Sequence, residues 1–450
     1  MKIQSSYKFL IVFLAGVSGL PAKTAALEPE KQQVETELMK KVTENIEKYR
    51  KGEVEIVFRN ASGQPLGNAE VEIQQTGSDF LFGCIIFPLV RGKEHPAPRI
   101  YRQMFKDIFN FAIFPFYWAG YESNQGMSEW QRLIPVIEWC KANDITTKGH
   151  PLVWTAPSGK PGWLTAYSND EQIELLKARL TNIVGGYKGM IDIWDVFNEA
   201  VNTRAWDDTS SGSWWIEVPV ETNVDLVEKA FKWAHRANPE AHLILNDFYQ
   251  ITREDTRERF FRMARELQRR GAPISGLGIQ AHEPRQEWYP PLEVWKTFER
   301  IAELGYPLHI TEFTPQSGGK EITGGWVEGT WNLVTQAAFA EQMFRLAFGH
   351  PSVVSINFWG FSDRRVWQEG GGLLDENFRP KPIYERLYKL VHQEWRTQLT
   401  MSTDRSGRVR FKGFYGDYKA AVTTPSGKRS SLDIRVRKQE ENRWVFTIEE

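Results

Sequence analysis

Two acidic residues lie at the ends of two apolar runs, where a pair of carboxyl groups could carry out catalysis. The run Ile191–Phe197 breaks off at Asn198-Glu199, and a second run, Pro307–Phe313, carries Glu312. A run that is apolar on both faces is typical of a strand buried in a parallel sheet. Two carboxyl groups at the ends of such strands could cleave a sugar acetal, one as proton donor and the other as nucleophile or base.

The elements that must position these carboxyl groups follow a repeated strand, loop and helix pattern over residues 80–395. The helical stretches include Asp225–Ala237 and Arg253–Arg270. Eight strands alternating with helices predict a (β/α)8 TIM barrel, an α/β fold, with a doubly wound open sheet as the alternative. Polar residues at the end of nearly every strand favour the barrel. The expected strands are Phe80–Ile86, Phe109–Phe114, Ile145–Gly149, Ile191–Phe197, His242–Asn246, Gly278–Gln280, Leu308–Thr311 and Val354–Phe358.

The segments on either side of the barrel differ from it in pattern. Residues 27–50 predict an amphipathic helix, with apolar residues at every fourth position (Val34, Leu38, Val42 and Ile46). Residues 51–79 predict a β-hairpin, and residues 396–450 a C-terminal β module. Neither has enough strands to bury a core alone. We expect the two to pair into one small accessory β-sandwich-like module interrupted by the barrel; a separate C-terminal module is the alternative.

Composition limits the classes of partner. The net charge of −1 gives no electrostatic case for nucleic acid or an anionic membrane. Residues 1–26 have a basic start, an apolar core and small residues for cleavage, which predicts a signal peptide and a secreted or periplasmic protein with no membrane attachment after cleavage. Cys84 and Cys140 are expected to be buried and unpaired. No metal or cofactor is expected, and we expect a monomer.

Several motifs share a resemblance. WDVFNEA around Glu199 resembles the acid/base motif of glycoside hydrolase family 10, the xylanase family, and HITEF around Glu312 is similar to its nucleophile motif. KGHPLVW, LNDF, GIQAHE and NFWGFSDRRVW follow in the family's order. The resemblance implies retaining hydrolysis of xylan or a related β-linked plant polysaccharide, without a cofactor. Glu199 would be the acid/base and Glu312 the nucleophile, with carboxyl groups about 5–5.5 Å apart.

The same resemblance implies a set of sugar-binding side chains. Asn198 would contact the sugar 2-hydroxyl, while His282 and Gln280 would keep Glu312 ionised. The full set expected to bind substrate is His150, Trp154, Asn198, Gln280, His282, Trp359, Trp367 and Tyr117. Trp194 is expected to be core packing, and Asp195 a buried structural partner.

The sequence departs from the family at three places, of which the stretch after Trp154, Thr155-Ala156-Pro157, is one. After the second strand the family has an Asn and a Lys, where this chain reads FPFYWAGYE; we expect Phe116, Tyr117 and Trp118 to line the cleft beside His150. Thr314 replaces an Asp that would orient the histidine at position 282. Two alternatives therefore stay open: action on another β-glycan or from a chain end, and a non-catalytic carbohydrate-binding protein. The presence of both carboxylates argues against the latter.

Overall fold

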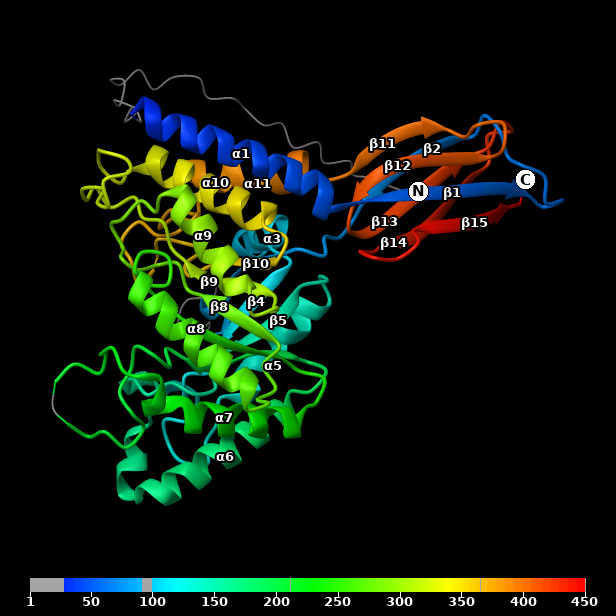
Figure 1. Ribbon diagram of the computed structural model, residues 1–450. Coiled ribbons are helices and arrows are strands. Elements are labelled where there is room, and N and C mark those ends of the chain that lie inside the picture. The colour runs from blue at the N-terminus through cyan, green and yellow to red at the C-terminus, as the bar shows by residue number, and fades with distance from the viewer. Residues whose placement is uncertain (1–27, 91–98, 211, 365, 450) are drawn as a thin grey trace.

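The computed structural model describes residues 28–90, 99–210, 212–364 and 366–449, so the predicted signal peptide lies outside the described residues. Eight parallel strands close into a barrel, with helices on its outside (Figure 1). The predicted TIM barrel is confirmed, and the open sheet is excluded because β10 pairs with both β3 and β9. The barrel strands are β3 (Leu81–Ile85), β4 (Phe111–Pro115), β5 (Thr146–His150), β6 (Ile193–Asn198), β7 (His242–Asp247), β8 (Gly276–Ile279), β9 (Leu308–Phe313) and β10 (Val353–Phe358).

Helices connect the successive strands, and two of them begin with side chains that cap the helix. Ser168 and Asn332 form capping boxes at the starts of α6 and α10. The expected helices Asp225–Ala237 and Arg253–Arg270 correspond to α7 and α8. The helices are α1 (Pro29–Tyr49), α2 (Phe87–Val90), α3 (Arg99–Ile108), α4 (Trp118–Tyr121), α5 (Trp130–Lys141), α6 (Asn169–Gly186), α7 (Val220–Ala237), α8 (Glu254–Arg269), α9 (Pro291–Ala302), α10 (Leu333–Gly349) and α11 (Pro382–Lys389). None of the helices in these described ranges is long and apolar enough to cross a membrane.

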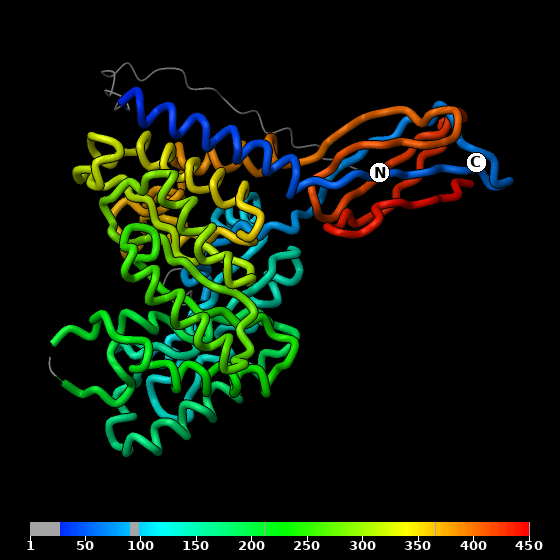
Figure 2. The backbone as a smooth tube through the Cα atoms, in the orientation of Figure 1, coloured from blue at the N-terminus to red at the C-terminus, as the bar shows by residue number. Residues whose placement is uncertain are grey.

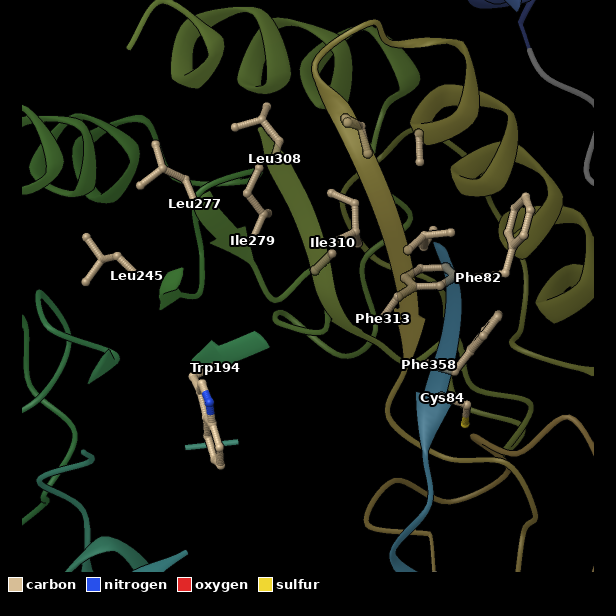
Figure 3. Close-up of a cluster of buried hydrophobic side chains, with 14 of the residues drawn as sticks. Phe82, Cys84, Trp194, Leu245, Leu277, Ile279, Leu308, Ile310, Phe313 and Phe358 are labelled. Carbon is tan, nitrogen blue, oxygen red and sulfur yellow. The ribbon is translucent and has the colours of Figure 1, made fainter. Parts of the chain in front are cut away.

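The main core lies in the barrel wall and between the barrel and its helices, where Figure 3 shows side chains such as Phe82, Trp194 and Phe358. Strands buried on both faces need apolar residues at successive positions, which explains their continuous apolar runs. Cys84 and Cys140 are both free and buried, as expected, and burial raises the pKa of the Cys140 thiol to about 12. These thiols are therefore unreactive packing groups.

The segments that flank the barrel form two further sheets, which Figure 2 shows side by side at one end of the molecule. One has the order β12-β1-β15 and the other β11-β2-β13-β14. The predicted pairing of the N- and C-terminal segments into one module is confirmed; we call it the β-sandwich. Its strands are β1 (Lys51–Asn60), β2 (Glu70–Gln75), β11 (Gln398–Ser402), β12 (Arg408–Phe414), β13 (Gly416–Thr423), β14 (Arg429–Val436) and β15 (Arg443–Ile448).

The expected hairpin of residues 51–79 is wrong in its pairing. β1 and β2 lie in different sheets: β1 pairs with β12 and β15, and β2 pairs with β11 and β13. Each strand buries one face, with Ile56 and Ile73 among the inward side chains. Alternating apolar and polar residues show that one face of each strand is buried. The same alternation is expected in a hairpin and in two stacked sheets, so it does not identify the partner strand.

The β-sandwich joins the barrel at the amino ends of its strands. Asn110, just before β4, donates hydrogen bonds from Nδ2 to the carbonyl oxygens of Ser78 and Phe80 at the sandwich–barrel connection. Arg50, between α1 and β1, donates to the carbonyl oxygens of Phe348 (2.6 Å) and Val353 (2.7 Å). The carboxyl ends of the strands, where active sites of such barrels lie, are at the opposite end.

Helix α1 packs along the outside of the barrel beside α10 and α9 (Figure 1). Leu38, Val42 and Ile46 are buried in that contact. Val34 is exposed, so the expected apolar stripe is correct for three of its four residues.

Candidate active site

Glu199 follows β6 directly and is held in a buried hydrogen-bonded position. Its backbone is in the left-handed region (φ 64°), and its N–H donates to the Asn246 carbonyl oxygen at 2.8 Å. Its carboxyl group accepts from Trp154 Nε1 (2.7 Å), Asn198 Nδ2 (2.9 Å) and Gln280 Nε2 (3.0 Å). Burial raises the pKa of Glu199 to about 8. A left-handed non-glycine residue is strained, which is a recurrent feature of functional sites.

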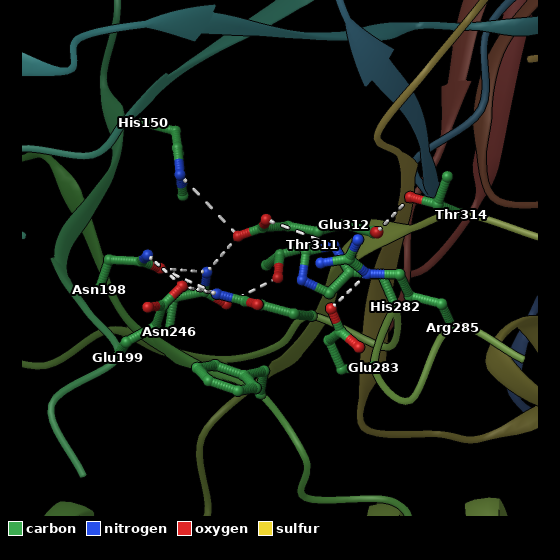
Figure 4. A network of polar contacts seen from close by, with 12 residues as sticks. His150, Asn198, Glu199, Asn246, His282, Glu283, Arg285, Thr311, Glu312 and Thr314 are labelled. Carbon is green, nitrogen blue, oxygen red and sulfur yellow. Dashed lines mark hydrogen bonds and ion pairs between the residues drawn. The ribbon is translucent and has the colours of Figure 1, made fainter. Parts of the chain in front are cut away.

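Glu312 lies on β9 near Asn246 and His150 (Figure 4) and is as buried as Glu199. Its Oε1 accepts from Asn246 Nδ2 at 2.8 Å and lies 3.9 Å from His150 Nε2, while its Oε2 lies 3.8 Å from His282 Nδ1. Burial, followed by the neighbouring Glu199 carboxylate, raises the pKa of Glu312 well above its ordinary value. The two carboxyl groups therefore share one water-poor environment and oppose each other's ionisation.

Asn246, at the end of β7, connects the two carboxyl groups. Its Nδ2 donates both to Glu312 and to Asn198 Oδ1, each at 2.8 Å, and its Oδ1 accepts from the Thr311 hydroxyl at 2.6 Å. Asn198 in turn donates to Glu199. The motif LNDF contains Asn246 but does not indicate its role; the available signal is its position at the carboxyl end of a strand.

Gln280 does not contact Glu312, the carboxyl group that it is expected to keep ionised. Its Nε2 donates to Glu199 and to Asn198 Oδ1 (3.2 Å), so the expectation that it holds Glu312 ionised is wrong. The reason is geometric: Gln280 follows β8, and its amide reaches across the barrel to the residues that end β6. Asn246 supplies the amide contact to Glu312 instead.

His150 is oriented by a buried ion pair beneath it. Asp195 Oδ2 lies 2.7 Å from Lys148 Nζ and 2.7 Å from His150 Nδ1, and the side chains are almost fully buried. Burial alone would raise the pKa of Asp195, but the Lys148 charge and the His150 hydrogen bond together hold it below its ordinary value. Burial also lowers the pKa of His150. The neutral ring therefore donates from Nδ1 to Asp195 and presents Nε2 toward Glu312 as an acceptor.

His282 is neutral beside Glu312. Burial, followed by the Arg285 charge, lowers the pKa of His282 to about 3. Its Nδ1 makes no hydrogen bond within the described residues, and the Thr314 hydroxyl donates to the Glu312 carbonyl oxygen rather than to the imidazole. The ring of Trp367 lies 4.9 Å from His282. Thr314 therefore does not orient the imidazole as the Asp of the family would.

The three aromatic residues that follow β4 do not all face the cleft. Tyr117 is half-buried, with its ring 5.5 Å from that of His150 and 5.8 Å from that of Trp154. Phe116 and Trp118 are buried, so the expectation that both line the cleft is wrong. Phe116 packs against Tyr121 and Trp194, and Trp118, the first residue of α4, packs against Trp163 and Trp206, so only Tyr117 faces His150.

Two further tryptophans lie at or beneath the site. Trp359, after β10, is nearly buried and packs edge-on to His150 at 4.8 Å. Trp194 is buried and donates to the Ile191 carbonyl oxygen, as its expected packing role requires.

Asp247 is a buried carboxylate in the motif LNDF, and the sequence pattern does not indicate its role. It accepts from Val201 N (3.0 Å), Phe248 N (2.9 Å) and Asn202 Nδ2 (2.6 Å), and burial raises its pKa to about 6. These bonds fix the turn that follows Glu199. No group of three or more His, Cys, Asp or Glu side chains in the described ranges could hold a metal ion.

Comparison with known proteins places this geometry in a family. The sequence model described as glycosyl hydrolase family 10 matches residues 89–390. The endo-1,4-beta-xylanase B of Thermotoga neapolitana is 34% identical over 269 residues, which are 57% of this chain and 73% of that protein. The anti-sigma-I factor RsgI6 of Acetivibrio thermocellus is 27% identical over 398 residues, which cover 88% of this chain and 48% of that protein.

A solved structure of the same class matches the barrel. Xylanase 10B of Thermotoga petrophila RKU-1, in complex with xylobiose, aligns with a TM-score of 0.56 and 26% identity, over 70% of this chain and 95% of that one. The barrel and its paired buried carboxyl groups are those of a glycoside hydrolase. Because the family match spans more than half of its length, the chain belongs to glycosyl hydrolase family 10.

Proposed function

We propose that the protein hydrolyses xylan, or a closely related β-linked plant glycan, with retention of configuration at the anomeric carbon, and that it acts outside the cytoplasm after removal of residues 1–26. The observation that carries the proposal is the hydrogen-bonded link Glu199–Asn198–Asn246–Glu312, which joins two buried carboxyl groups, one just after β6 and one on β9 of the same barrel. The names of the relatives in the family support the choice of xylan.

Because the two carboxyl groups oppose each other's ionisation, the reactive form carries one proton between them, on Glu199, while Glu312 is ionised. In the first step, the Glu312 carboxylate attacks the anomeric carbon and Glu199 gives its proton to the leaving oxygen. The raised pKa of Glu199 keeps that proton available near neutral pH. Once the proton has left, Trp154, Asn198 and Gln280 stabilise the carboxylate through their three hydrogen bonds.

In the second step, the Glu199 carboxylate takes a proton from water, which attacks the glycosyl–enzyme intermediate and frees Glu312. His150 Nε2 and the Asn198 amide are the groups that contact sugar hydroxyls. Tyr117, beside His150, takes the part of the sugar site where the family has a hydrogen-bonding lysine. An aromatic ring favours the apolar face of a sugar over its hydroxyl groups, and this change supports a related β-glycan as the alternative substrate.

The first experiment is a panel of soluble β-glycans that includes xylan, with release of reducing ends as the readout. Glu312→Ala is the inactive control, and Glu287→Gln changes a carboxyl group elsewhere on the barrel. Release from xylan by the wild type and by Glu287→Gln alone supports the proposal. Binding of glycans without any release would instead indicate a carbohydrate-binding protein.

A second experiment separates the two roles on a reactive aryl glycoside that the wild type accepts. Glu199→Ala removes proton transfer, worth about 10²–10⁴-fold in rate, but an activated leaving group needs no proton. This variant should give a burst of phenolate and then stall, and azide should restore turnover with a β-glycosyl azide as product. Glu312→Ala should give no burst. Rescue of Glu312→Ala by azide to the same β product would show that the roles are reversed.

A further inference from the structure

Arg179, on α6, is a buried arginine that the two-carboxylate chemistry does not use. It is 5% exposed, and its Nε and Nη1 atoms have no hydrogen-bond partner among the described residues. Burial lowers the pKa of Arg179 to about 9, which leaves the guanidinium charged at neutral pH. A buried charge with unsatisfied donors costs stability. The place that this side chain takes in the fold therefore calls for a functional reason.

The contacts of Arg179 converge on the turn that follows β4. Its Nη2 atom donates a hydrogen bond to the Phe116 carbonyl oxygen. The guanidinium carbon lies 5.1 Å from the centre of the Trp118 ring and 5.4 Å from that of Tyr121. Such contacts between a cation and an aromatic ring are strongest where water is excluded. One side chain of α6 thus holds three positions of the turn.

Tyr117 lies between two of the positions that Arg179 holds. Before it, the Phe116 N–H donates to the His150 carbonyl oxygen at 2.7 Å. After it, the Tyr121 N–H donates to the Tyr117 carbonyl oxygen at 2.7 Å and forms the single turn of α4. With the backbone fixed on both sides, the Tyr117 ring lies 5.5 Å from that of His150. The direction of this ring therefore depends on the turn that Arg179 contacts.

We propose that Arg179 is a positioning residue for the sugar site, which fixes the turn of residues 116–121 and so keeps the Tyr117 ring against His150. The inference rests on the glycan hydrolysis proposed above, in which Tyr117 takes part in the sugar site. A guanidinium suits this task because its planar face stacks on aromatic rings while its edge donates to a carbonyl oxygen. Arg179 acts on sugar binding through Tyr117, from a helix on the outside of the barrel.

The test is a double-mutant cycle on glycans that the wild type cleaves. Arg179→Met exchanges the buried charge for an apolar side chain, so the protein should fold with a Tm close to that of the wild type. Its kcat/KM should fall about tenfold, mainly through KM, because Tyr117 is no longer held in place. Tyr117→Ala should lower kcat/KM as well, and adding Arg179→Met to it should have no further effect.

The matched control is a second arginine that lies away from the barrel mouth. Arg396 is half-buried and donates from Nε to the carbonyl oxygen of Gln75, on β2 of the β-sandwich, at 2.9 Å. Arg396→Met therefore also removes a hydrogen bond from a guanidinium to the backbone. Its kcat/KM should equal that of the wild type.

Two kinetic outcomes would overturn the proposal. One is equal kcat/KM for Arg179→Met and wild type. The other is the same loss from Arg179→Met with and without Tyr117→Ala, which would mean that Arg179 does not act through Tyr117.

Crystal structures of the wild type and of Arg179→Met give a readout that needs no substrate. A Tyr117 ring displaced from His150 in the variant supports the proposal, and an unchanged ring position overturns it. If the wild type cleaves no glycan, the proposed hydrolysis fails, while the two structures still decide whether Arg179 positions Tyr117.

Discussion

The barrel and the β-sandwich both pair strands that lie far apart in the sequence, yet they bury different kinds of side chain. The barrel interior contains the Lys148–Asp195 ion pair and both carboxyl groups. The β-sandwich core consists mainly of apolar side chains such as Ile56 and Ile73, and its charged pairs lie on the outside.

Buried polar groups cost stability unless every one is paired, so a protein has reason to keep them only where chemistry needs them. The difference between the two regions therefore indicates that the mouth of the barrel performs the reaction. The β-sandwich sits at the amino ends of the barrel strands, away from the carboxyl groups, which is consistent with a supporting role.

The largest effect should follow from breaking the buried ion pair of the barrel. Asp195→Ala leaves Lys148 charged and unpaired in the interior and should cost about 3–5 kcal/mol of stability. His150 also loses its partner, so kcat should fall. Denaturant unfolding measures the stability, and Lys148→Met combined with Asp195→Ala should recover much of it. A single variant as stable as the wild type would mean that the pair is not buried as described.

A change in the core of the β-sandwich should separate stability from catalysis. Ile56→Ala leaves a cavity between the two sheets and should cost about 2–5 kcal/mol. Because the β-sandwich does not touch the carboxyl groups, kcat/KM below the melting temperature should stay at the wild-type value. Thermal unfolding and initial rates on the same sample test both parts. A matching loss of kcat/KM would show that the β-sandwich shapes the barrel mouth.

The raised pKa of Glu199 predicts that the stability of the protein depends on pH through this barrel residue and not through the β-sandwich. The folded pKa is about 8, above the ordinary value of 4.5, so the contribution of protonated Glu199 is complete below 4.5, declines above it and is lost once the pH has risen past about 8. Glu199→Gln cannot ionise. Its Tm relative to the wild type should therefore rise by a few degrees between pH 5 and pH 8. A constant difference across this range would contradict the raised pKa.

The smallest effect is expected on the outer face of the β-sandwich. Glu55 pairs with Arg410 and Arg443 at the surface, and these two bonds lower the pKa of Glu55, with the Arg410 hydrogen bond as the main cause. Solvent and salt screen such pairs, so Glu55→Gln should change Tm hardly at all, and not at all in high salt. Repeating the melt across a salt series tests this. A drop as large as that of Asp195→Ala would remove the contrast between the two regions.

Much of the fold could be predicted because its signals are local. Apolar runs such as Ile191–Phe197 separated by helical stretches indicate parallel strands, and parallel strands of one barrel all end at the same edge. For that reason the sequence alone predicted that Glu199 and Glu312 would lie at one mouth. Buried, unpaired cysteines and the pairing of the two flanking β segments also followed from pattern and composition.

Tertiary structure decided whatever depends on a distant partner. Ile56 pairs with Val409 and Trp444, and no local pattern separates that arrangement from a hairpin with residues 70–75. Gln280 bonds to Glu199 rather than to Glu312, and Asn246 connects the two carboxyl groups, because side-chain reach across the barrel depends on strand stagger. In the same way, only the folded chain turns Tyr117 toward His150 and leaves Trp214 exposed beside Trp154, since hydrophobicity alone does not distinguish a buried ring from a ring that faces a cleft.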